Sequence, residues 1–181
     1  MKAILGELPY SGKIEFGSVK PSIAWLPQIY HVPIRIPVID FVAMGSVKAN
    51  SFLPFLPTNS KEKAKDSLCI LNISHLQNKF TDELSGGEWQ LVCLAQMKTQ
   101  DANIWLLDEP TSSLDIGYKY KVFEFLWKES ESGKTVVIST HDIPFLPPDK
   151  GSILFLSDDP VVIENSPVHQ TEVIQYLKSL A

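Results

Sequence analysis

Apolar and polar positions in the first part of the chain predict little regular structure. Residues 13–16 alternate between the two kinds and predict a short strand, and the apolar run at residues 22–26 predicts a second strand that Pro27 ends. Beyond it, prolines recur between strongly apolar stretches up to Pro57, and within this part only residues 38–44 fit a short helix.

The middle of the chain shows helical periodicity interrupted by apolar runs of strand length. Residues 61–73 predict a helix with Ala64, Leu68 and Leu71 on one face. After a break at residues 81–87, the pattern predicts a helix at 88–98, a buried strand at 104–107, an amphipathic helix at 118–127 and a buried strand at 135–138. Strand, helix and strand at this spacing predict a βαβ unit with parallel strands.

The end of the chain predicts a hairpin followed by a helix. Gly133 is expected to end the amphipathic helix before the second buried strand. Residues 153–156 and 161–164 flank a turn-forming Ser-Asp-Asp-Pro sequence and predict two paired strands, and residues 172–180 predict a closing helix. The complete pattern therefore favours the α/β class with a parallel sheet.

Composition narrows the function classes. The 181 residues are 44% apolar and 20% charged, as in an ordinary folded domain, which excludes a disordered chain. The net charge is −5, with 16 Lys and Arg against 21 Asp and Glu, so we expect no nucleic-acid partner. No stretch approaches the ~18 apolar residues of a membrane span. Cys69 and Cys93 both lie in apolar helical patterns and are interpreted as reduced core thiols.

The proline-rich stretch at residues 28–57 carries more apolar residues than a surface loop needs. Its apolar residues include Ile34, Ile36, Phe41, Phe52 and Phe55. Such a segment cannot bury all of its apolar surface locally, which favours an interaction surface. The alternative is a satellite core under a long loop.

Candidate chemistry follows the two buried strands. One ends in Asp108 and Glu109, and the other continues through Ser139 and Thr140 into His141. Carboxyl ends of neighbouring parallel strands share one edge of a sheet, so two carboxylates and an imidazole would converge there. That combination suits phosphoryl chemistry, in which one carboxylate holds Mg²⁺, the next polarises a water and the imidazole contacts the phosphate.

A second candidate site precedes the helix at 88–98. Ser85, Gly86 and Gly87 would let a phosphate approach backbone N–H groups at a helix N-terminus. Ordinary capping of that helix by Ser85 is the alternative interpretation.

Five motifs together resemble the ATP-binding-cassette (ABC) ATPases, in the order that this family shows. The signature motif is LSGGE at 84–88, the Walker B motif LLDEPT at 106–111, the D-loop SSLD at 112–115, the switch histidine motif STHD at 139–142 and the Q-loop AWLPQ at 24–28. Residues 37–45 further resemble importers of metal ions, metal chelates and cobalamin. The resemblance covers nearly the whole chain.

The resemblance implies roles for the residues at the strand ends. Asp108 would coordinate Mg²⁺ and Glu109 would orient the attacking water. His141 would contact the γ-phosphate of ATP. Gln28 would sense Mg²⁺ and couple the site to a membrane partner.

It also implies that the signature motif serves a second cassette. Ser85, Gly86, Gly87 and Glu88 would bind the γ-phosphate of an ATP molecule that the other cassette mainly holds. Asp115 would help to form the interface between the two cassettes. The partners implied are therefore a second cassette and an integral-membrane permease that meets residues 28–57.

The phosphate-binding P-loop, G-x-x-x-x-G-K-[ST], is missing from the sequence. The nearest match, from Gly6 to Gly12 and Lys13, has five residues between the glycines, and Ile14 replaces the required hydroxyl. By the resemblance, the chain begins just after the P-loop. It is then a fragment, a chain whose missing parts another chain supplies, or a degenerate cassette.

The resemblance divides the chain into four parts. These are residues 1–27, a remnant of the N-terminal core; 28–98, the Q-loop and helical signature subdomain; 99–164, the core with the Walker B motif, D-loop and switch histidine; and 165–181, a C-terminal helix. The implied fold is an incomplete P-loop NTPase, with a RecA-like parallel-sheet core and an inserted helical subdomain.

Three functions are consistent with these motifs. The first is the ATP-binding subunit of an importer, cytoplasmic and peripheral to the cell membrane, which we expect to hydrolyse ATP negligibly as this chain alone. The second is a catalytically inactive module that pairs with a complete cassette. The third, a DNA-repair or translation ATPase, is disfavoured because no heptads interrupt the motifs, no second cassette follows and the charge is acidic.

Overall fold

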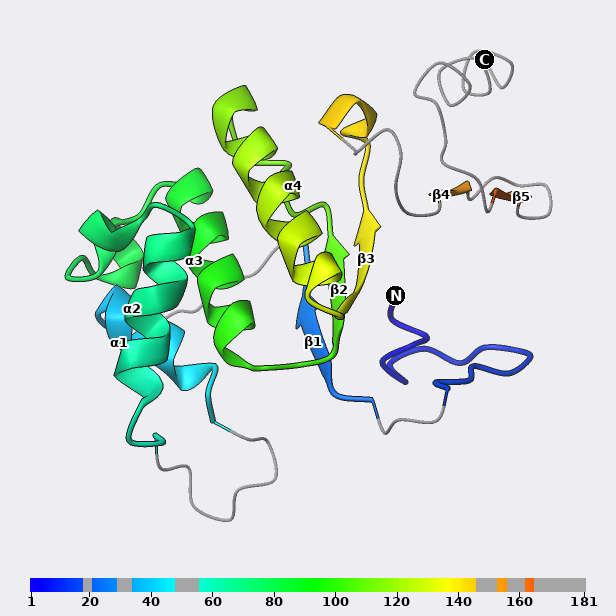
Figure 1. Ribbon diagram of the computed structural model, residues 1–181, viewed down its shortest axis with the longest axis horizontal. Helices are drawn as coiled ribbons and strands as arrows, with labels where there is room; N and C mark the ends of the chain where they lie inside the picture. The colour runs from blue at the N-terminus through cyan, green and yellow to red at the C-terminus, as the bar shows by residue number, and fades with distance from the viewer. Residues whose placement is uncertain (18–20, 29–33, 48–55, 146–152, 156–161, 165–181) are drawn as a thin grey trace. The chain divides into compact units, whose positions relative to one another are not determined.

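The structure is a computed structural model. It describes the chain except for residues 18–20, 29–33, 48–55, 146–152, 156–161 and 165–181 (Figure 1). The chain divides into two units, Met1–Thr140 and His141–Ala181.

A parallel sheet of three strands forms the base of the first unit. The strands are β1 (Ile23–Leu26), β2 (Ile104–Asp108) and β3 (Thr135–Ser139), in the order β1-β2-β3. Leu26 of β1 pairs with Leu107 of β2. The register therefore brings the carboxyl ends of all three strands to one edge, and it confirms the predicted parallel βαβ unit.

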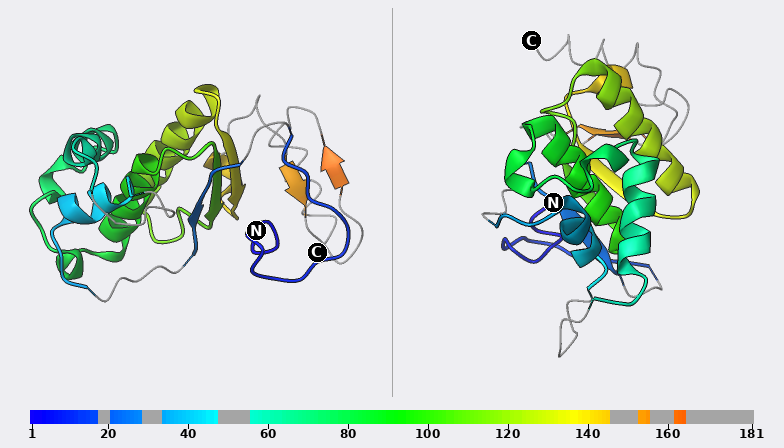
Figure 2. Two further views of the ribbon diagram at one scale, coloured as in Figure 1. Left: turned by 90° about the horizontal axis from the view of Figure 1, so that it is seen from below. Right: turned by 90° about the vertical axis from the view of Figure 1, so that its left-hand side faces the viewer.

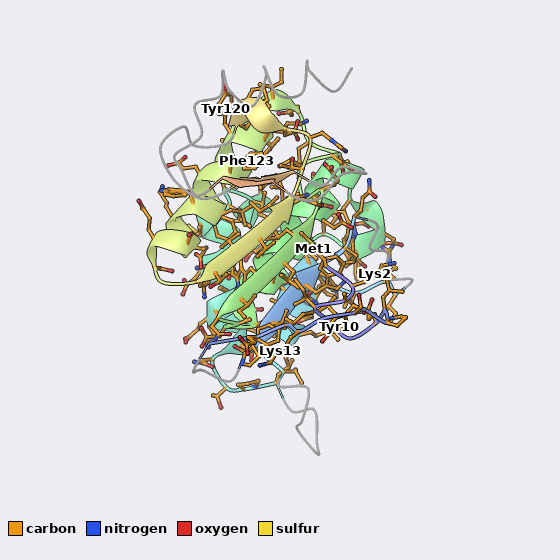
Figure 3. All side chains as sticks on the ribbon, turned by 90° about the vertical axis from the view of Figure 1, so that its right-hand side faces the viewer. Met1, Lys2, Tyr10, Lys13, Tyr120 and Phe123 are labelled. Carbon is orange, nitrogen blue, oxygen red and sulfur yellow. The ribbon has the colours of Figure 1, made fainter. Side chains whose placement is uncertain are left out.

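Two long helices cover one face of this sheet. They are α3 (Gly86–Thr99) and α4 (Ile116–Glu131), and both begin at the edge toward which the strands point (Figure 1). Trp105 of β2 meets Phe125 of α4 with ring centroids 5.8 Å apart. Figure 3 shows β1, β2 and β3 side by side, from the opposite face. The strand ends and the helix starts thus lie at a common edge, where a site can form.

Two further helices pack against α3 on the side away from the sheet (Figure 2). They are α1 (Val38–Met44) and α2 (Ser60–Ile70), and short 3₁₀ turns at Ser74–Leu76 and Thr81–Glu83 lead from α2 to α3. The buried apolar residues of this group include Val38, Phe41, Val42, Ala64, Leu68, Leu71, Ile73, Leu76, Leu91, Leu94 and Met97. Their burial stabilises the group, since each large apolar side chain contributes about 1.5–3 kcal/mol when fully buried.

Close approach of α1 and α3 depends on a glycine. Gly45 follows α1, and a Cβ atom there would overlap the Thr99 hydroxyl and the Gln96 carbonyl oxygen of α3. The Thr99 hydroxyl lies 2.8 Å from the carbonyl oxygen of Val42 and 2.7 Å from that of Gln96. The two helices are therefore joined by a polar contact that only a residue without a side chain leaves room for.

Most predicted elements of the first unit are confirmed, with two corrections. Residues 13–16 form no strand; alternation over so few residues does not hold a strand without a neighbour to pair with. The helix predicted to reach residue 73 ends at Ile70, because Asn72 adopts a left-handed φ of 58°. The glycine predicted to end α4 is confirmed, as Gly133 has a φ of 99°.

The second unit contains the predicted hairpin. Strands β4 (Ile153–Phe155) and β5 (Val162–Glu164) pair in the antiparallel direction. A 3₁₀ turn, Ile143–Phe145, precedes them. The helix predicted at residues 172–180 lies outside the described residues.

The two cysteines differ in exposure. Both thiols are free, and Cys93 is buried in α3 as predicted, where burial raises the pKa of its thiol. Cys69 is exposed on α2, so its interpretation as a core thiol is wrong. Its neighbour Leu68 takes the buried position of that turn instead.

Candidate functional site

The acidic residues that end β2 are held by one side chain of β3. Asp108 and Ser139 are register partners at the ends of the two strands. The Ser139 hydroxyl donates to Oδ1 of Asp108. It also lies 3.3 Å from the backbone nitrogen of Glu109, which in addition donates to the carbonyl oxygen of Ser139 at 3.0 Å. Ser139 therefore fixes both the first carboxylate and the backbone of the second.

Glu109 has an unusual backbone conformation. Its φ is 50°, in the left-handed region that residues with a Cβ rarely adopt. Its carbonyl oxygen accepts from the backbone nitrogen of Ser112 at 3.2 Å, which closes a turn over the buried Pro110. Backbone strain of this kind collects at functional positions, because surrounding contacts must hold it in place.

The strand edge fits a magnesium ion by its ligand chemistry. Asp108 is half-buried and offers carboxylate oxygen next to a hydroxyl, and Mg²⁺ takes oxygen ligands. Among the described residues no group of three or more His, Cys, Asp or Glu side chains comes together. A single carboxylate still suits Mg²⁺, which keeps several waters and takes its other ligands from substrate phosphates.

The signature residues form a capping box at the start of α3. Ser85 Oγ accepts from the Glu88 backbone nitrogen at 3.3 Å, and Glu88 Oε2 accepts from the Ser85 backbone nitrogen at 2.8 Å. Glu88 Oε1 also binds the ammonium group of Lys79 at 2.9 Å. The Ser85 backbone N–H, followed by Lys79, lowers the pKa of the Glu88 carboxyl. The capping interpretation of Ser85 is thus confirmed, and it leaves Gly86 and Gly87 in the first turn.

The same turn touches the predicted D-loop. A Cβ atom on Gly87 would lie 3.2 Å from the Ser113 carbonyl oxygen and 3.4 Å from Cδ2 of Leu114, whereas one on Gly86 would meet nothing within 4 Å. Asp115 caps α4, since its Oδ1 accepts from the backbone nitrogen of Tyr118 at 3.0 Å. The structure therefore brings the signature turn and the D-loop together.

Two further predicted residues are exposed. Gln28 is exposed and follows the last residue of β1 by two positions, at the edge where Asp108 also lies. His141 is exposed and opens the second unit, two residues after β3. Their roles toward Mg²⁺ and the γ-phosphate stay predictions.

Sequence reasoning missed Ser139 as a site residue. The sequence shows Ser139 only as a strand-end residue within the switch histidine motif, because pattern alone does not reveal which residue faces Asp108 across the sheet. The signal that could have found it is the parallel register itself, which places a hydroxyl opposite a strand-terminal carboxylate. A separate small cavity of about 140 Å³ lies between β1 and α3, and its lining residues are Trp25, Leu26, Pro27, Cys93, Gln96, Met97 and Gln100.

The apolar stretch at residues 28–57 divides between core and surface. Phe41 is buried in the helical group, so the satellite-core alternative is correct for α1. Ile34 is 56% exposed and Ile36 is half-buried. Phe52 and Phe55 lie outside the described residues. No helix in the described part of the chain is both long and apolar enough to cross a bilayer.

A parallel sheet with acidic residues at its carboxyl edge and a helical group beside it is the arrangement expected of the P-loop NTPase fold. The family model described as ABC transporter matches residues 1–112, more than half of the 181 residues. The chain therefore belongs to the ABC transporter family. A solved ATP-binding cassette of an ABC transporter, 17% identical with a TM-score of 0.69, shares the fold over 87% of this chain and 66% of its own length.

Relatives of this chain include ATP-binding proteins of import and transport systems. The molybdate import ATP-binding protein MolC of Haemophilus influenzae is 36% identical over 135 residues, 74% of this chain and 52% of its own length. The manganese transport system ATP-binding protein MntB of Listeria innocua is 29% identical over 188 residues, 97% of this chain and 77% of its own length. A metal-chelate type ABC transporter in an inward-facing conformation is 27% identical with a TM-score of 0.78, over 99% of this chain and 70% of that one. The chain spans about half the length of MolC.

Proposed function

We propose that the chain acts as the ATP-binding subunit of an ABC importer and couples ATP hydrolysis to transport of a metal ion, a metal chelate or cobalamin. The observation that carries the proposal is the contact of Ser139 with both Asp108 and Glu109, which places two ordered acidic residues at the edge of a parallel sheet. The capped signature turn beside the D-loop gives it a second, independent support.

Each residue of the strand edge has a stated part in this proposal. Asp108 holds Mg²⁺, which when bound neutralises charge on the ATP phosphates. Glu109 orients the attacking water. Its backbone nitrogen is held by the carbonyl oxygen and the hydroxyl of Ser139, so its side chain starts from a fixed point of the backbone. His141 contacts the γ-phosphate, and Gln28 links the Mg²⁺ site to the membrane partner.

The signature turn completes the site of another cassette. Its first-turn N–H groups at Gly86 and Gly87 and the positive end of the α3 dipole attract a phosphate. Ser85 and Glu88 hold that turn in shape, and Asp115 orders the neighbouring start of α4. A second cassette is therefore a partner of the proposed site.

The permease is the other proposed partner. The exposed Ile34 lies in the 28–57 stretch, where an amphipathic helix of a permease would dock. The proposed location is accordingly the cytoplasmic face of the cell membrane. The relatives named above belong to molybdate import and manganese transport, and the metal or chelate class is proposed here by that similarity.

An inactive partner module is the second candidate function. The 181 residues contain no P-loop, whose backbone and lysine cradle the phosphates in this fold. In the inactive module, Ser85, Gly86 and Gly87 serve a complete cassette, and the carboxylate edge hydrolyses nothing.

Nucleotide binding and pairing test the proposal. We expect a fluorescent ATP analogue with Mg²⁺ not to bind the 181-residue chain alone, and hydrolysis to be negligible. If an in-frame P-loop is encoded upstream, the longer form that contains it is made with the substitution Glu109→Gln. This form should change from monomer to dimer when ATP is added, and the additional substitution Ser85→Arg should prevent dimerisation. Turnover by the 181 residues that Glu109→Gln abolishes contradicts the need for a P-loop. If the Glu109→Gln form with a P-loop stays a monomer when ATP is added, the proposal of an importer subunit is contradicted. If no P-loop is encoded upstream, the inactive partner module is the function that fits.

A further inference from the structure

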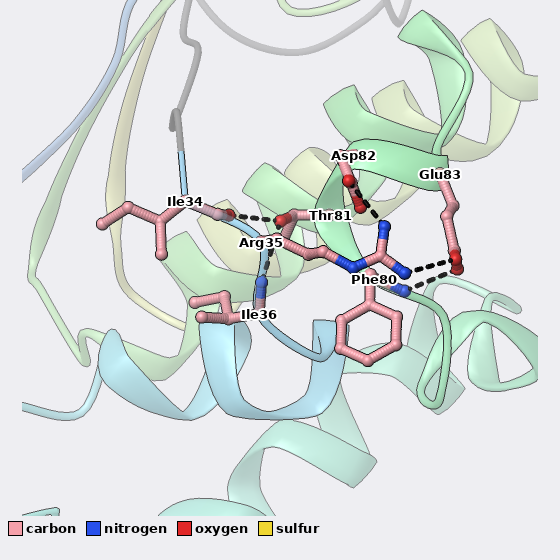
Figure 4. A network of polar contacts seen from close by, with 7 residues as sticks. All are labelled: Ile34, Arg35, Ile36, Phe80, Thr81, Asp82 and Glu83. Atoms are coloured by element: carbon pink, nitrogen blue, oxygen red, sulfur yellow. Dashed lines mark hydrogen bonds and ion pairs between the residues drawn. The ribbon is translucent and has the colours of Figure 1, made fainter.

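Residues 34–39 run antiparallel to the segment that precedes the signature motif. The Val38 backbone nitrogen donates to the Lys79 carbonyl oxygen at 2.9 Å, and the Thr81 backbone nitrogen donates to the Ile36 carbonyl oxygen at 3.0 Å. The buried Thr81 hydroxyl donates to the Ile34 carbonyl oxygen at 2.7 Å and lies 3.4 Å from the Ile36 nitrogen (Figure 4). The stretch that follows the Q-loop is thus joined to the turn before α3.

Arg35, the chain's single arginine, is exposed and binds the acidic side chains of that turn. Its Nη1 donates to Oδ2 of Asp82 at 2.7 Å, and its Nη2 donates to Oε1 of Glu83 at 3.1 Å. Its Cζ lies 4.2 Å from the centre of the Phe80 ring. Figure 4 shows the guanidinium reaching both carboxylates from one side chain. A planar fork of donors can hold two carboxylates and stack on a ring together, which a lysine ammonium cannot.

The turn that Arg35 binds, Thr81–Glu83, leads directly into the signature motif. Glu83 also accepts from the Phe80 backbone nitrogen at 2.9 Å, so the residue that Arg35 binds shapes the turn itself. Two residues later Ser85 begins the capping box with Glu88. The α1 residue Phe41 packs on Trp89 of the first α3 turn, with ring centroids 4.9 Å apart. The start of α3 is therefore held both by the turn and by α1.

We propose that Arg35 is a positioning residue that ties the segment after the Q-loop to the signature motif, so that a displacement of residues 34–37 is transmitted to Ser85 and Glu88. The purpose of this tie rests on the proposed function, in which the permease meets residues 28–57 and the signature motif meets ATP. The Thr81 hydroxyl and the backbone pairing hold the two segments side by side, and Arg35 restricts their relative motion.

Amide hydrogen exchange of the 181-residue chain tests this tie. The reporters are the backbone N–H groups of Ser85, Glu88 and Trp89, which all donate within the capping box or its first turn. Arg35→Gln is expected to raise their exchange rates about fivefold, the scale of an exposed ion pair, and to leave α4 unchanged. Arg35→Lys should give an intermediate increase, since the charge remains and the fork is lost.

Two further variants keep the test decisive. Lys128→Gln removes an exposed pair with Glu124 of equal length, 2.7 Å, within α4, and should leave the three reporters at wild-type rates. The reversed pair Arg35→Asp with Asp82→Arg should restore part of the protection. Unchanged reporters in Arg35→Gln, or equal increases throughout the chain, overturn the tie; if Arg35→Gln does not fold, Asp82→Asn replaces it. Because these measurements contain neither ATP nor permease, their failure leaves the proposed function standing.

Discussion

The hydroxyl of Ser139 donates a hydrogen bond to the carboxylate of Asp108 across the β2–β3 boundary. The same oxygen lies 3.3 Å from the backbone nitrogen of Glu109. A side chain thirty-one positions away from Asp108 thus holds the carboxylate of Asp108 and the backbone of Glu109, the two acidic residues on which the proposed chemistry depends.

Replacing Ser139 by alanine should destabilise the strand edge. The half-buried carboxylate of Asp108 loses a hydrogen bond, and a bond to a charged group contributes about 1.5–3 kcal/mol. We expect urea unfolding to show a free energy lower by about 1–2 kcal/mol. Ser139→Thr, which keeps the hydroxyl, is the matched control and should lose less. Equal stability of Ser139→Ala and wild type would show that the contact contributes nothing.

The two signature glycines should respond differently to alanine. Gly86 has open space around its Cβ position and no left-handed φ, so Gly86→Ala should gain about 0.4–1 kcal/mol of stability by restricting the unfolded chain. Gly87→Ala brings a methyl group to 3.2 Å from the Ser113 carbonyl oxygen and should be less stable than Gly86→Ala. Thermal unfolding of the two variants side by side checks the order. A more stable Gly87→Ala contradicts the close contact with the D-loop.

Acid should weaken the capping box through Glu88. Its pKa is lowered in the folded chain, so the unfolded chain binds a proton more readily. The stabilisation is complete above the ordinary glutamate pKa of about 4.3 and is lost as the pH falls through the lower, folded value. The difference in unfolding free energy between wild type and Glu88→Gln should therefore shrink from pH 6 toward pH 3 in urea titrations. Only the contribution of the glutamate charge is lost, because glutamine keeps a side-chain oxygen as acceptor. A constant difference over that range would contradict the assignment.

Gly45→Ala should separate α1 from α3. The added methyl group overlaps the Thr99 hydroxyl and the Gln96 carbonyl oxygen, and relief requires the helices to move apart. Overpacking of this kind costs about 1–3 kcal/mol, which chemical unfolding resolves. Gly117→Ala provides the comparison, because its Cβ would make only an ordinary contact of 3.4 Å with Asp115. Equal effects of the two substitutions would exclude a specific clash at Gly45.

Much of the first unit could be predicted because its patterns are local. The buried strands are visible in the sequence as apolar runs, and the apolar positions on the buried faces of α2 and α4 recur with the helical period. The signature turn is equally local, since Ser85 and Glu88 cap the helix that they begin. Prediction failed at residues 13–16, where alternation occurs without a neighbouring strand, and at Cys69, where periodicity placed the exposed side chain one position from its buried neighbour.

The remaining features join segments that are distant in sequence. Ser139 meets Asp108 only because β2 and β3 pair in one register, and alternation along a strand does not state its partner's register. Arg35 reaches Asp82 across 47 positions. Such contacts depend on how the helical group packs on the sheet, which single-sequence patterns do not encode.

The left-handed backbone of Glu109 bears on how this sequence would change over generations. A residue with a Cβ in that region costs about 1–2 kcal/mol relative to glycine, and asparagine tolerates it better than glutamate does. Folding alone thus favours replacement at position 109, while hydrolysis alone favours keeping the carboxylate. In lineages where the carboxylate is no longer needed, we expect drift to reach this position early and to move it toward glycine or asparagine, before the buried neighbours that any folded descendant must retain.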